Sequence, residues 1–589
     1  MHRATTTIRH IARREMLAAA AAALATAKDT AWKIGIAQIS LSDRLEENQK
    51  KIVAYIRKAA AEQCRVVVFP EGSLCAEPAA EAPEIDRSLA EIRAAATAAK
   101  IYVLLGGKSI ALGEKVSRNW MVAVEPAGKQ ILRYDKLYDN PRARAPGVFS
   151  MDGWGCSAII CADRWLRAIE DLPVFDGARV TFELSNNYDS EWVPELGWYW
   201  YVPRAIRNGA YVVLANTCGG GKHGHSAVIA PDGSMVAASE NEERLLAVTI
   251  DPAQASRKES LRRVDHPILN KFWQAGKRAL QSGAPPPEKF EPLVAPEVDV
   301  RLSIAQMSCN SGVEANVARM AKLIAEAARG GADVVAFPEL AVTGSSESEV
   351  KGADARTLAQ ALRRIQQAAR ESHVCVVFGM PHIEKNRLTN AAFVFGPDGS
   401  LLTRYDQLAV NRPKLFQPGE QASTMWFRVK GVPAVVTIGH DGLWSEIAEL
   451  TALAGAHLHV HITNEAGSGR DQSLRRMQIW ANLASWGTFT ATVNAASPAG
   501  GGSAIWEDLH RKDETALAKV GRAPEGHEKM AVYSPFSANC LSRAGENERI
   551  LSAVERMNLK TLHHSMSKNP QMAAWYTLGA QILGPPRNW

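Results

Sequence analysis

Short runs of β-branched and apolar residues alternate along this chain with longer stretches in which apolar residues recur at helical spacing. The short runs predict strands and the longer stretches predict helices, and their alternation indicates an α/β fold. Residues 157–160 (SAII) have little polar character on either side, which predicts a sheet covered on both faces. The clearest predicted elements are strands at 66–69, 102–105, 158–160 and 211–215, and helices near 48–63 and 84–99.

This pattern occurs twice along the chain. Arg65–Glu71 (RVVVFPE) is matched by Asp333–Glu339 (DVVAFPE), and each is an apolar strand that ends in Phe-Pro-Glu. A repeat of this length predicts two related units, which has to be known before a fold is assigned. Four further pairs match in the same order: Ile34–Gln38 with Leu302–Gln306, Pro126–Lys136 with Pro397–Gln407, Gly155–Trp165 with Pro433–Trp444, and His266–Gly276 with Asn569–Gly579.

Length and composition agree with two units. The chain has 589 residues, more than one core usually serves, and its hydrophobic fraction of 46% is enough for two cores. A linker is predicted at 282–297, which holds three consecutive prolines and few periodic apolar residues. The predicted units are therefore 28–281 and 298–589.

The first 27 residues are set apart from this fold. The pair Arg13 and Arg14 precedes a short Ala-rich run that ends with small residues at 25–27, as in a twin-arginine export signal. This interpretation predicts a segment 1–27 that is removed, and export to the bacterial periplasm. A frayed amphipathic helix with a chance arginine pair is the alternative.

Net charge and hydropathy exclude two classes of partner. The formal net charge is +6, and it falls to +3 without segment 1–27, which carries four arginines and one glutamate. So small a charge argues against a polyanionic partner such as a nucleic acid. The Ala-rich run is shorter than the roughly 20 residues of a bilayer span, so we expect no membrane attachment after signal removal.

The eight cysteines do not define a disulfide framework, because sequence alone cannot pair them. An oxidising compartment would permit disulfides. Several, including Cys156 and Cys375, lie inside apolar runs, where a buried thiol behaves as a small hydrophobic group. We interpret all of them in this way except Cys161.

Three residues at predicted strand ends form a coherent chemical set, namely Glu71, Lys136 and Cys161. A thiol attacks a carbonyl or nitrile carbon as the thiolate, so it requires a nearby base and a positive charge. Glu71 can take the thiol proton and later pass it to departing ammonia or amine, if a closed pocket raises its pKa toward neutrality. Lys136 can hold the oxyanion of a tetrahedral intermediate together with the backbone amide of Ala162. The set predicts acyl transfer.

The motifs that carry these residues are Phe-Pro-Glu, Tyr-x-Lys and Cys161–Trp165 (CADRW), and Arg204–Asn216 and Gly224–Gly233 follow in the same order. In this combination the first unit resembles the nitrilase, or carbon-nitrogen hydrolase, superfamily. The resemblance spans about 32–280 and, more weakly, 300–589. It implies a four-layer αββα sandwich in each unit, the triad of Glu71, Lys136 and Cys161, and neither a metal nor an organic cofactor.

The resemblance also has consequences for assembly and for substrate binding. Two such sandwiches commonly pack through their helical layers, so the tandem units are expected to form an internal pseudo-dimer, with homo-oligomers as a further expectation. Many members of the superfamily carry a second glutamate shortly after the lysine, and residues 137–150 contain none. Arg142 and Arg144 stand there instead. They either grip a substrate carboxylate in bidentate fashion or are solvated loop residues.

The second unit lacks most of the reactive set. It keeps Glu339, but the aligned segments place Gln407 and His440 where the first unit has its lysine and cysteine. We therefore expect this half to be catalytically inactive and to shape, cover or dimerise with the first. His457–His461 (HLHVH) puts three imidazoles on one face of a strand and could bind zinc, but a histidine ladder in the core needs no metal.

Substrate-binding residues are predicted from the aromatic segment after the nucleophile. Trp165 and Trp192 are expected to line the pocket and to favour a hydrophobic or aromatic acyl group, whereas residues 198–201 are expected to pack in the core. Asn187, just past its strand, is predicted as a polar wall of the pocket, with a turn residue bonding its own backbone as the alternative.

Three functions from different classes remain open at this stage. The first is thiol-dependent hydrolysis of a non-peptide carbon-nitrogen bond of a small molecule, an amide in preference to a nitrile, through a covalent acyl-enzyme. The second is an acyltransferase that uses the same triad and passes the acyl group to an amine. The third is a scaffold or binding protein in which both halves are inactive.

Overall fold

The structure is a computed structural model that describes most of the two predicted units. Segment 1–27, most of the predicted linker, Arg142 and Arg144 lie outside the described residues, so the proposed boundaries at 28–281, 282–297 and 298–589 stay predictions. The described residues are 31–76, 82–110, 117–138, 140, 147–188, 192, 197–282, 291–296, 298, 300–465, 477–479, 481–483, 486, 488–497, 500–506, 529–532, 566–586 and 589.

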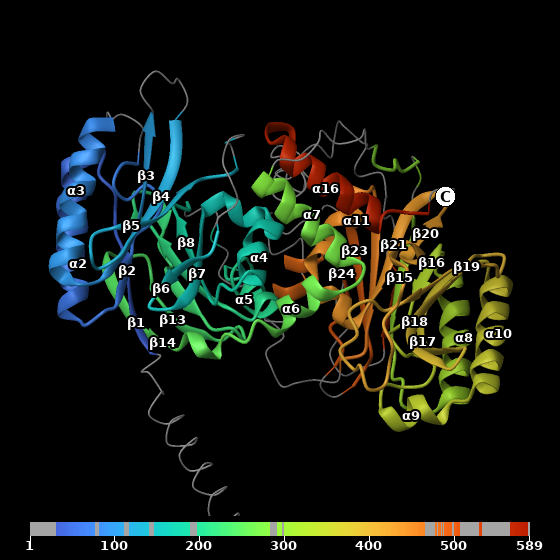
Figure 1. Cartoon of the computed structure of the whole chain (residues 1–589). Helices are drawn as coiled ribbons and strands as arrows, with labels where there is room; N and C mark the ends of the chain where they lie inside the picture. Colours follow the sequence, from blue (N-terminus) through green and yellow to red (C-terminus); the bar gives the residue numbers. More distant parts are fainter. Residues whose placement is uncertain are drawn as a thin grey trace, which may run out of the picture.

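The N-terminal half contains a first six-stranded sheet in the order β14-β1-β2-β3-β4-β5, in which β1, β2 and β3 run parallel. One face of this sheet is covered by helices α2 and α3, which pack on each other (Figure 1). The bounds are β1 Trp32–Gln38, β2 Val66–Val68, β3 Tyr102–Ile110, β4 Ser117–Val124, β5 Gln130–Asp135, β14 Arg244–Ile250, α2 Leu45–Ala61 and α3 Ala82–Ala99.

A second six-stranded sheet has the order β13-β12-β9-β8-β7-β6, with β7, β8 and β9 parallel. The two sheets pack face to face, since Ile36 and Val68 of the first share a buried cluster with Ile160 and Val213 of the second. The bounds are β6 Phe149–Met151, β7 Trp154–Ile160, β8 Val180–Ser185, β9 Tyr211–Asn216, β12 Ala227–Ile229, β13 Met235–Ala238, α4 Arg167–Phe175, α5 Val202–Asn208, α6 Lys258–Asp265 and α7 Leu269–Ser282, with a short hairpin of β10 Cys218–Gly219 and β11 Lys222–His223.

The C-terminal half repeats this plan with sheets in the orders β19-β18-β17-β16-β15-β25 and β20-β21-β22-β23-β24. Helices α8 and α10 cover the outer face of the first, and α11 and α16 lie toward the N-terminal half (Figure 1). The bounds are β15 Leu302–Gln306, α8 Val313–Arg329, β16 Val334–Ala336, α9 Glu347–Gly352, α10 Ala355–Ser372, β17 Cys375–Glu384, β18 Arg387–Phe395, β19 Leu401–Asp406, β20 Trp426–Val429, β21 Val432–Ile438, α11 Ser445–Leu453, β22 Leu458–Thr463, β23 Phe489–Asn494, β24 Ala504–Trp506, β25 Lys529–Val532 and α16 Pro570–Leu583.

The predicted α/β class and the αββα layers are therefore confirmed. Each predicted strand and helix is present, with bounds that differ by a few residues. Helix α2 begins at Leu45, three residues before the predicted start, and Glu46 and Glu47 lie in its first turn, where negative charge interacts favourably with the helix dipole.

The two halves pack through α4 and α7 of the first and α11 and α16 of the second, and an ion pair joins α6 to α11. Helices α7 and α16 run beside each other between the sandwiches (Figure 1). A Cβ at Gly276 of α7 would overlap the Trp575 ring, and one at Gly579 of α16 would lie 2.8 Å from the Phe272 ring. Each glycine thus receives an aromatic ring of the other helix. These positions correspond in the two repeats.

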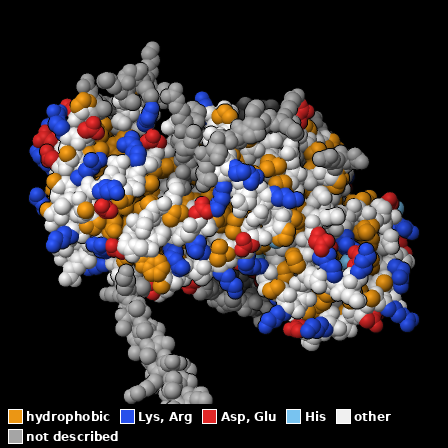
Figure 2. Space-filling view, in the orientation of Figure 1, with side chains coloured by type: hydrophobic (Ala, Val, Ile, Leu, Met, Phe, Trp, Pro, Cys, Tyr) orange, Lys and Arg blue, Asp and Glu red, His pale blue; other side chains and the backbone are white. Residues whose placement is uncertain are grey.

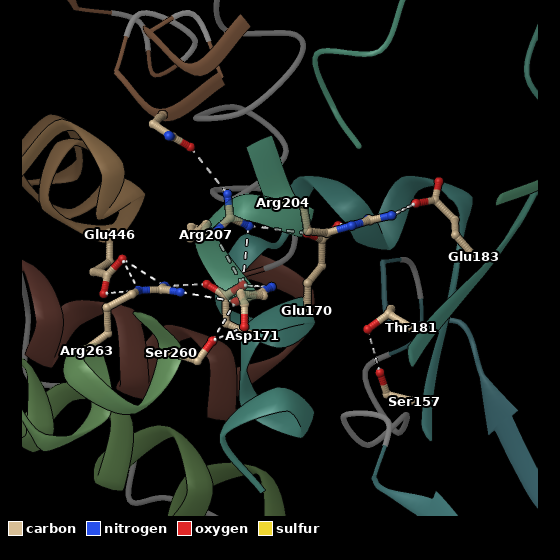
Figure 3. Close-up of polar contacts among 12 residues, drawn as sticks. Ser157, Glu170, Asp171, Thr181, Glu183, Arg204, Arg207, Ser260, Arg263 and Glu446 are labelled. Atoms are coloured by element: carbon tan, nitrogen blue, oxygen red, sulfur yellow. Dashed lines mark hydrogen bonds and ion pairs between the residues drawn. The ribbon is translucent and has the colours of Figure 1, made fainter. Parts of the chain in front are cut away.

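A buried ion pair and a buried hydrogen bond cross the contact between the halves (Figure 3). Arg263 pairs with Asp171 of its own half and, at 2.9 Å, with Glu446 of the other. Arg207 contacts Asp171 at 3.3 Å and donates to the side chain of Asn482. Because removing one partner of a buried pair leaves an uncompensated charge, typically at a cost of about 3–5 kcal/mol, these contacts fix the relative placement of the halves.

On the face drawn in Figure 2, basic side chains are interspersed with acidic, apolar and other side chains over both halves. Within the part of the chain that the structure describes, no helix combines the length and the apolar character needed to cross a bilayer.

Candidate active site

The three predicted catalytic residues come together in the first half. Glu71 follows β2, Lys136 follows β5, and Cys161 begins a 3₁₀ turn, η1 (Cys161–Trp165), after β7. Because the two sheets face each other, residues from their strand ends meet at one edge. The Lys136 ammonium lies 2.8 Å from a Glu71 carboxylate oxygen, and Glu71 is 5% exposed. The Cys161 thiol forms a hydrogen bond with Glu71 and lies close enough to Lys136 for an electrostatic interaction.

Glu71 and Lys136 form a charged pair. Burial by itself would raise the pKa of Glu71, but the Lys136 charge and hydrogen bonds from Lys136, Asn119 and Cys161 together lower it. Burial opposes the charge of Lys136, yet the negative charge of Glu71 raises the pKa of Lys136 overall. The expected rise of the Glu71 pKa toward neutrality is therefore wrong, because the sequence did not reveal how closely the lysine pairs with it.

The resting state of Cys161 also differs from the expected thiolate. Burial, followed by the negative charge of Glu71, raises the pKa of Cys161 to about 11, although Arg164 and Lys136 act in the opposite direction. The resting sulfur is thus a neutral thiol, and a base has to accept its proton during attack. The backbone at Cys161 has a φ of +44°, a left-handed conformation that non-glycine residues rarely adopt outside functional sites.

Asn187 lies closer to the reacting atoms than the prediction of a pocket wall implied. Its Oδ1 accepts from the Cys161 thiol at 3.3 Å and from Arg164 at 3.0 Å, and its Nδ2 donates to the Tyr201 hydroxyl at 3.2 Å. Its own backbone N–H is bonded to the Asn216 side chain. The side chain of Asn187 therefore contacts the Cys161 sulfur. This contact differs from the alternative interpretation, in which Asn187 was a turn residue with its side chain bonded to its own backbone.

Sequence reasoning missed Asp163 and Asn119, which hold the set in place. Asp163 accepts from the Tyr134 hydroxyl at 2.6 Å and from the backbone N–H of Tyr138 at 3.0 Å, which ties the loop after Lys136 to the turn that carries Cys161. Asn119 Nδ2 donates to Glu71 at 2.6 Å. Both could have been found from the repeat, because Asp441 and Asn390 occupy the corresponding positions.

The other predicted binding residues either follow Cys161 directly in the chain or pack against aromatic rings. Ala162 is buried beside Cys161 in η1. Trp165 packs edge-on against Tyr138 with ring centroids 5.7 Å apart, and Trp192 stacks on His225 at 3.7 Å. Residues 199–201 pack in a buried cluster with Trp486 of the second half, as expected for core residues.

The second half has a different arrangement at the corresponding place, and it corrects the sequence alignment. Cys161–Trp165 superposes in register on Gly439–Leu443, because Asp163 and Asp441 both accept from a tyrosine and both follow the strand by the same distance. Gly439, with a φ of +47°, therefore replaces the cysteine, and His440 replaces Ala162. The predicted place of His440 is wrong by one residue, because the two aligned segments differ in length.

Glu339 occupies the place of Glu71 without a lysine. It accepts from Asn390 at 2.6 Å and from the backbone N–H of Asn464 at 3.0 Å, while Gln407 donates away from it to the carbonyl of Ile438. Burial raises the pKa of Glu339 to about 6. A Cβ on Gly439 would lie 2.8 Å from the Glu339 carboxylate, so the space of the nucleophile is occupied.

The histidines of the second half make protein contacts. His440 Nε2 lies 2.9 Å from Glu259 of the first half. The imidazoles of His459 and His461 both bond the Thr437 hydroxyl, at 2.7 and 2.9 Å, which agrees with the ladder interpretation. Among the described residues, no group of three or more His, Cys, Asp or Glu side chains has the geometry of a metal site.

Comparison with known proteins gives a consistent result. A family model described as Carbon-nitrogen hydrolase matches residues 33–258 and 301–507. Omega-amidase NIT2 from Xenopus tropicalis is 26% identical, over 43% of this chain and 87% of the relative. Omega-amidase NIT2 from Mus musculus is also 26% identical, over 27% of this chain and 62% of the relative. This chain thus spans less than two thirds of the mouse relative. A solved amidase from Nesterenkonia sp. is 19% identical, covers 39% of this chain and 95% of its own, and has a TM-score of 0.35.

Proposed function

The chain belongs to the carbon-nitrogen hydrolase family and is an enzyme of amidase or nitrilase type, and from this premise we propose that its first half hydrolyses a small-molecule amide through Cys161. A single observation carries the proposal: Glu71, Lys136 and Cys161 converge in the first half, whereas the corresponding residues of the second half include neither a lysine nor a thiol. The relatives named omega-amidase and amidase favour an amide over a nitrile.

The proposed reaction begins with a neutral thiol and an ionised Glu71. As Cys161 Sγ forms a bond to the amide carbon, its proton passes to the Glu71 carboxylate. Lys136 and the backbone N–H of Ala162 stabilise the oxyanion of the tetrahedral intermediate. Glu71 then returns the proton to the leaving nitrogen, the carbon-nitrogen bond breaks, and ammonia or an amine departs from a thioester. Water then attacks the thioester while Glu71 accepts its proton, and the carbon-sulfur bond breaks. Glu71 passes that proton to the departing sulfur, which releases the acid and restores both the thiol and the ionised carboxylate.

Substrate selection is proposed to involve the residues around this set. Trp165 and Trp192 offer aromatic surface, and Asn187 offers an amide beside the sulfur. Such a lining favours an acyl group with a hydrophobic or aromatic portion.

We further propose that the second half serves as a built-in, catalytically inactive subunit. The reciprocal contacts of Gly276 with Trp575 and of Gly579 with Phe272 support an internal pseudo-dimer. Glu339 fills the space in which a side chain at Gly439 would stand, so a nucleophile there would not be accommodated. Removal of segment 1–27 on export remains part of the proposal, and fractionation of cells into periplasm and cytoplasm tests it.

The proposal is tested by substituting the nucleophile. Cys161→Ala should abolish ammonia release from a pool of amides, because no thioester can form. Cys156→Ala is the matched control, since it removes a buried thiol from β7, the strand that precedes Cys161, and should leave turnover nearly unchanged. Measurable hydrolysis by Cys161→Ala would refute the proposal.

The acyl group can be identified by intact mass after the wild-type protein is mixed with the same pool. A mass increase that is absent in Cys161→Ala reports the thioester. If an added amine captures the acyl group in preference to water, the enzyme is an acyltransferase and the hydrolysis assignment fails. A protein with no selectively labelled Cys161 would be a binding protein.

A further inference from the structure

We propose that Arg164 is a further catalytic residue of the first half, which stabilises the negative charge on the Cys161 sulfur and holds the Asn187 amide against it. This inference rests on the proposed function, since it concerns the same nucleophile. It adds a second cation to the site, beside Lys136.

The local fold explains why Arg164 reaches the sulfur. Cys161 and Arg164 are the first and fourth residues of η1, a 3₁₀ turn, in which side chains three positions apart lie on the same side. Arg164 Nη1 donates to Cys161 Sγ at 3.7 Å. Its Nη2 donates to Asn187 Oδ1 at 3.0 Å, and the same oxygen accepts from the thiol at 3.3 Å. One guanidinium therefore contacts both the nucleophile and its hydrogen-bond acceptor.

The acidic neighbour of Arg164 also pairs with a second arginine. Arg164 is 5% exposed and pairs with Glu183 at 3.1 Å. Glu183 also pairs at 2.6 Å with Arg204, which in turn contacts Glu170 (Figure 3). Burial raises the pKa of Glu170 to about 7, so that carboxyl is only partly ionised near neutrality. Arg164 and Arg204 thus share the carboxylate of Glu183.

The other titratable groups that face Cys161 do not replace this charge. Lys136 is already paired with Glu71, and the negative charge of Glu71 disfavours a thiolate. Tyr201, behind Asn187, has a pKa raised by burial and is neutral. Burial, with the charges of His225 and Arg164, lowers the pKa of His223 to about 4, so it is also neutral. Among the charges near Cys161, Arg164 lowers the pKa of its thiol most strongly.

The second half provides an internal comparison. The position of Arg164 is occupied there by Gly442, and the position of Glu183 by His461, whose ring would lie 2.8 Å from a Cβ on that glycine. The half that lacks the nucleophile therefore also lacks the arginine and its acidic partner. In contrast, the second half retains the counterpart of the Tyr134–Asp163 hydrogen bond, because the Tyr405 hydroxyl donates to Asp441 at 2.8 Å. Asp441 also accepts from the backbone N–H of Ala409, so it positions the backbone.

The test follows the alkylation of Cys161 by iodoacetamide as a function of pH in the full-length chain. Arg164→Gln removes the charge and should raise the midpoint of alkylation by about one pH unit, because an opposite charge at this range lowers a pKa by roughly 1–3 units. Alkylation below the midpoint should then be about tenfold slower. Arg164→Lys keeps a positive charge, so the alkylation midpoint should stay close to that of the parent. Turnover should still fall, because lysine cannot make the second hydrogen bond that the guanidinium donates to Asn187.

Arg167→Gln is the matched control, since it removes a buried arginine of the next turn whose guanidinium lies over the Trp200 and Trp486 rings. Its alkylation midpoint should equal that of the parent. An alkylation midpoint in Arg164→Gln equal to that of the parent would overturn the inference. A midpoint shifted as far in Arg164→Lys as in Arg164→Gln would also overturn it. If Arg164→Gln does not fold, a midpoint raised by about one pH unit in Arg164→Lys decides against the inference. A parent protein whose Cys161 can be removed without loss of turnover would instead overturn the proposed function.

Discussion

Glu71 and Glu339 occupy the same position in the two repeats, yet their pKa values are shifted in opposite directions. Each follows a buried strand and accepts at 2.6 Å from an asparagine, Asn119 or Asn390. The pKa of Glu71 is lowered because Lys136 lies beside it, whereas burial raises the pKa of Glu339 to about 6 where Gln407 has replaced the lysine. One side chain thus decides whether the carboxyl is ionised and ready to act as a base at mildly acidic pH.

Asn119→Ala tests the charge state of Glu71. The asparagine donates to the ionised carboxylate, so its loss should raise the pKa of Glu71. Because a base acts when deprotonated, the acid limb of kcat/KM should move to higher pH, by about one unit for a hydrogen bond to a charged group worth about 1.5 kcal/mol. The measurement is a pH-rate profile of ammonia release.

Asn390→Ala is the control for this prediction, because it removes the same contact in the second half. Its pH-rate profile should coincide with that of the parent. Equal displacement of the acid limb in both variants would show that the effect is not specific to Glu71.

At the scale of elements, the close approach of α7 and α16 depends on two glycines. Their Cβ positions are occupied by aromatic rings of the facing helix, which lets the helices approach and bury Phe272 and Trp575. The same positions in both repeats carry this contact, and they belong to the matched segments His266–Gly276 and Asn569–Gly579. The spacing alone did not reveal that the two segments pack on each other.

Gly276→Val should therefore destabilise the protein. The added side chain overlaps the Trp575 ring, and overpacking of a filled core typically costs about 1–3 kcal/mol. Thermal unfolding followed by circular dichroism should show a clearly lowered Tm. Gly352→Ala is the control, since its Cβ would meet no atom within 4 Å and the Tm should change little. Equal Tm values for the two variants would contradict the packing described for α7 and α16.

At the scale of the whole molecule, charged groups are buried between the halves. Arg263 joins Asp171 to Glu446, and Glu449 of α11 is fully buried nearby. Burial raises the pKa of Glu449, and the charge of Arg167 offsets this only in part. The contact between the halves therefore holds a carboxyl that is more easily protonated in the folded chain than in the unfolded one.

The stability of the molecule should for this reason depend on pH through Glu449. With its pKa raised on folding, the folded state holds the proton more tightly, so this contribution is present below the unfolded pKa of about 4.5 and is lost as pH rises toward the folded value. Glu449→Gln cannot ionise. The difference in Tm between this variant and the parent should grow in favour of the variant from pH 5 to pH 9. A difference that is constant over this range would contradict the raised pKa.

The α/β class, the duplication and the three residues that meet in the first half could all be predicted from the sequence. These features are carried by local patterns: apolar runs fix the strands, and short motifs at strand ends place Glu71, Lys136 and Cys161 at one edge of the sandwich. The repeat also contained Asn119 and Asp163, because Asn390 and Asp441 recur at matching positions.

The charge states in the site, and the residue that replaces the cysteine in the second half, depend on tertiary contacts. Whether Glu71 is ionised depends on the 2.8 Å contact with Lys136, which comes from another strand, and the protonated state of Cys161 depends on burial. The replacement of the cysteine by Gly439 became clear only from the matching contacts of Asp163 and Asp441. Distances between residues far apart in the chain set these electrostatic energies. A linear pattern of residue types does not contain those distances.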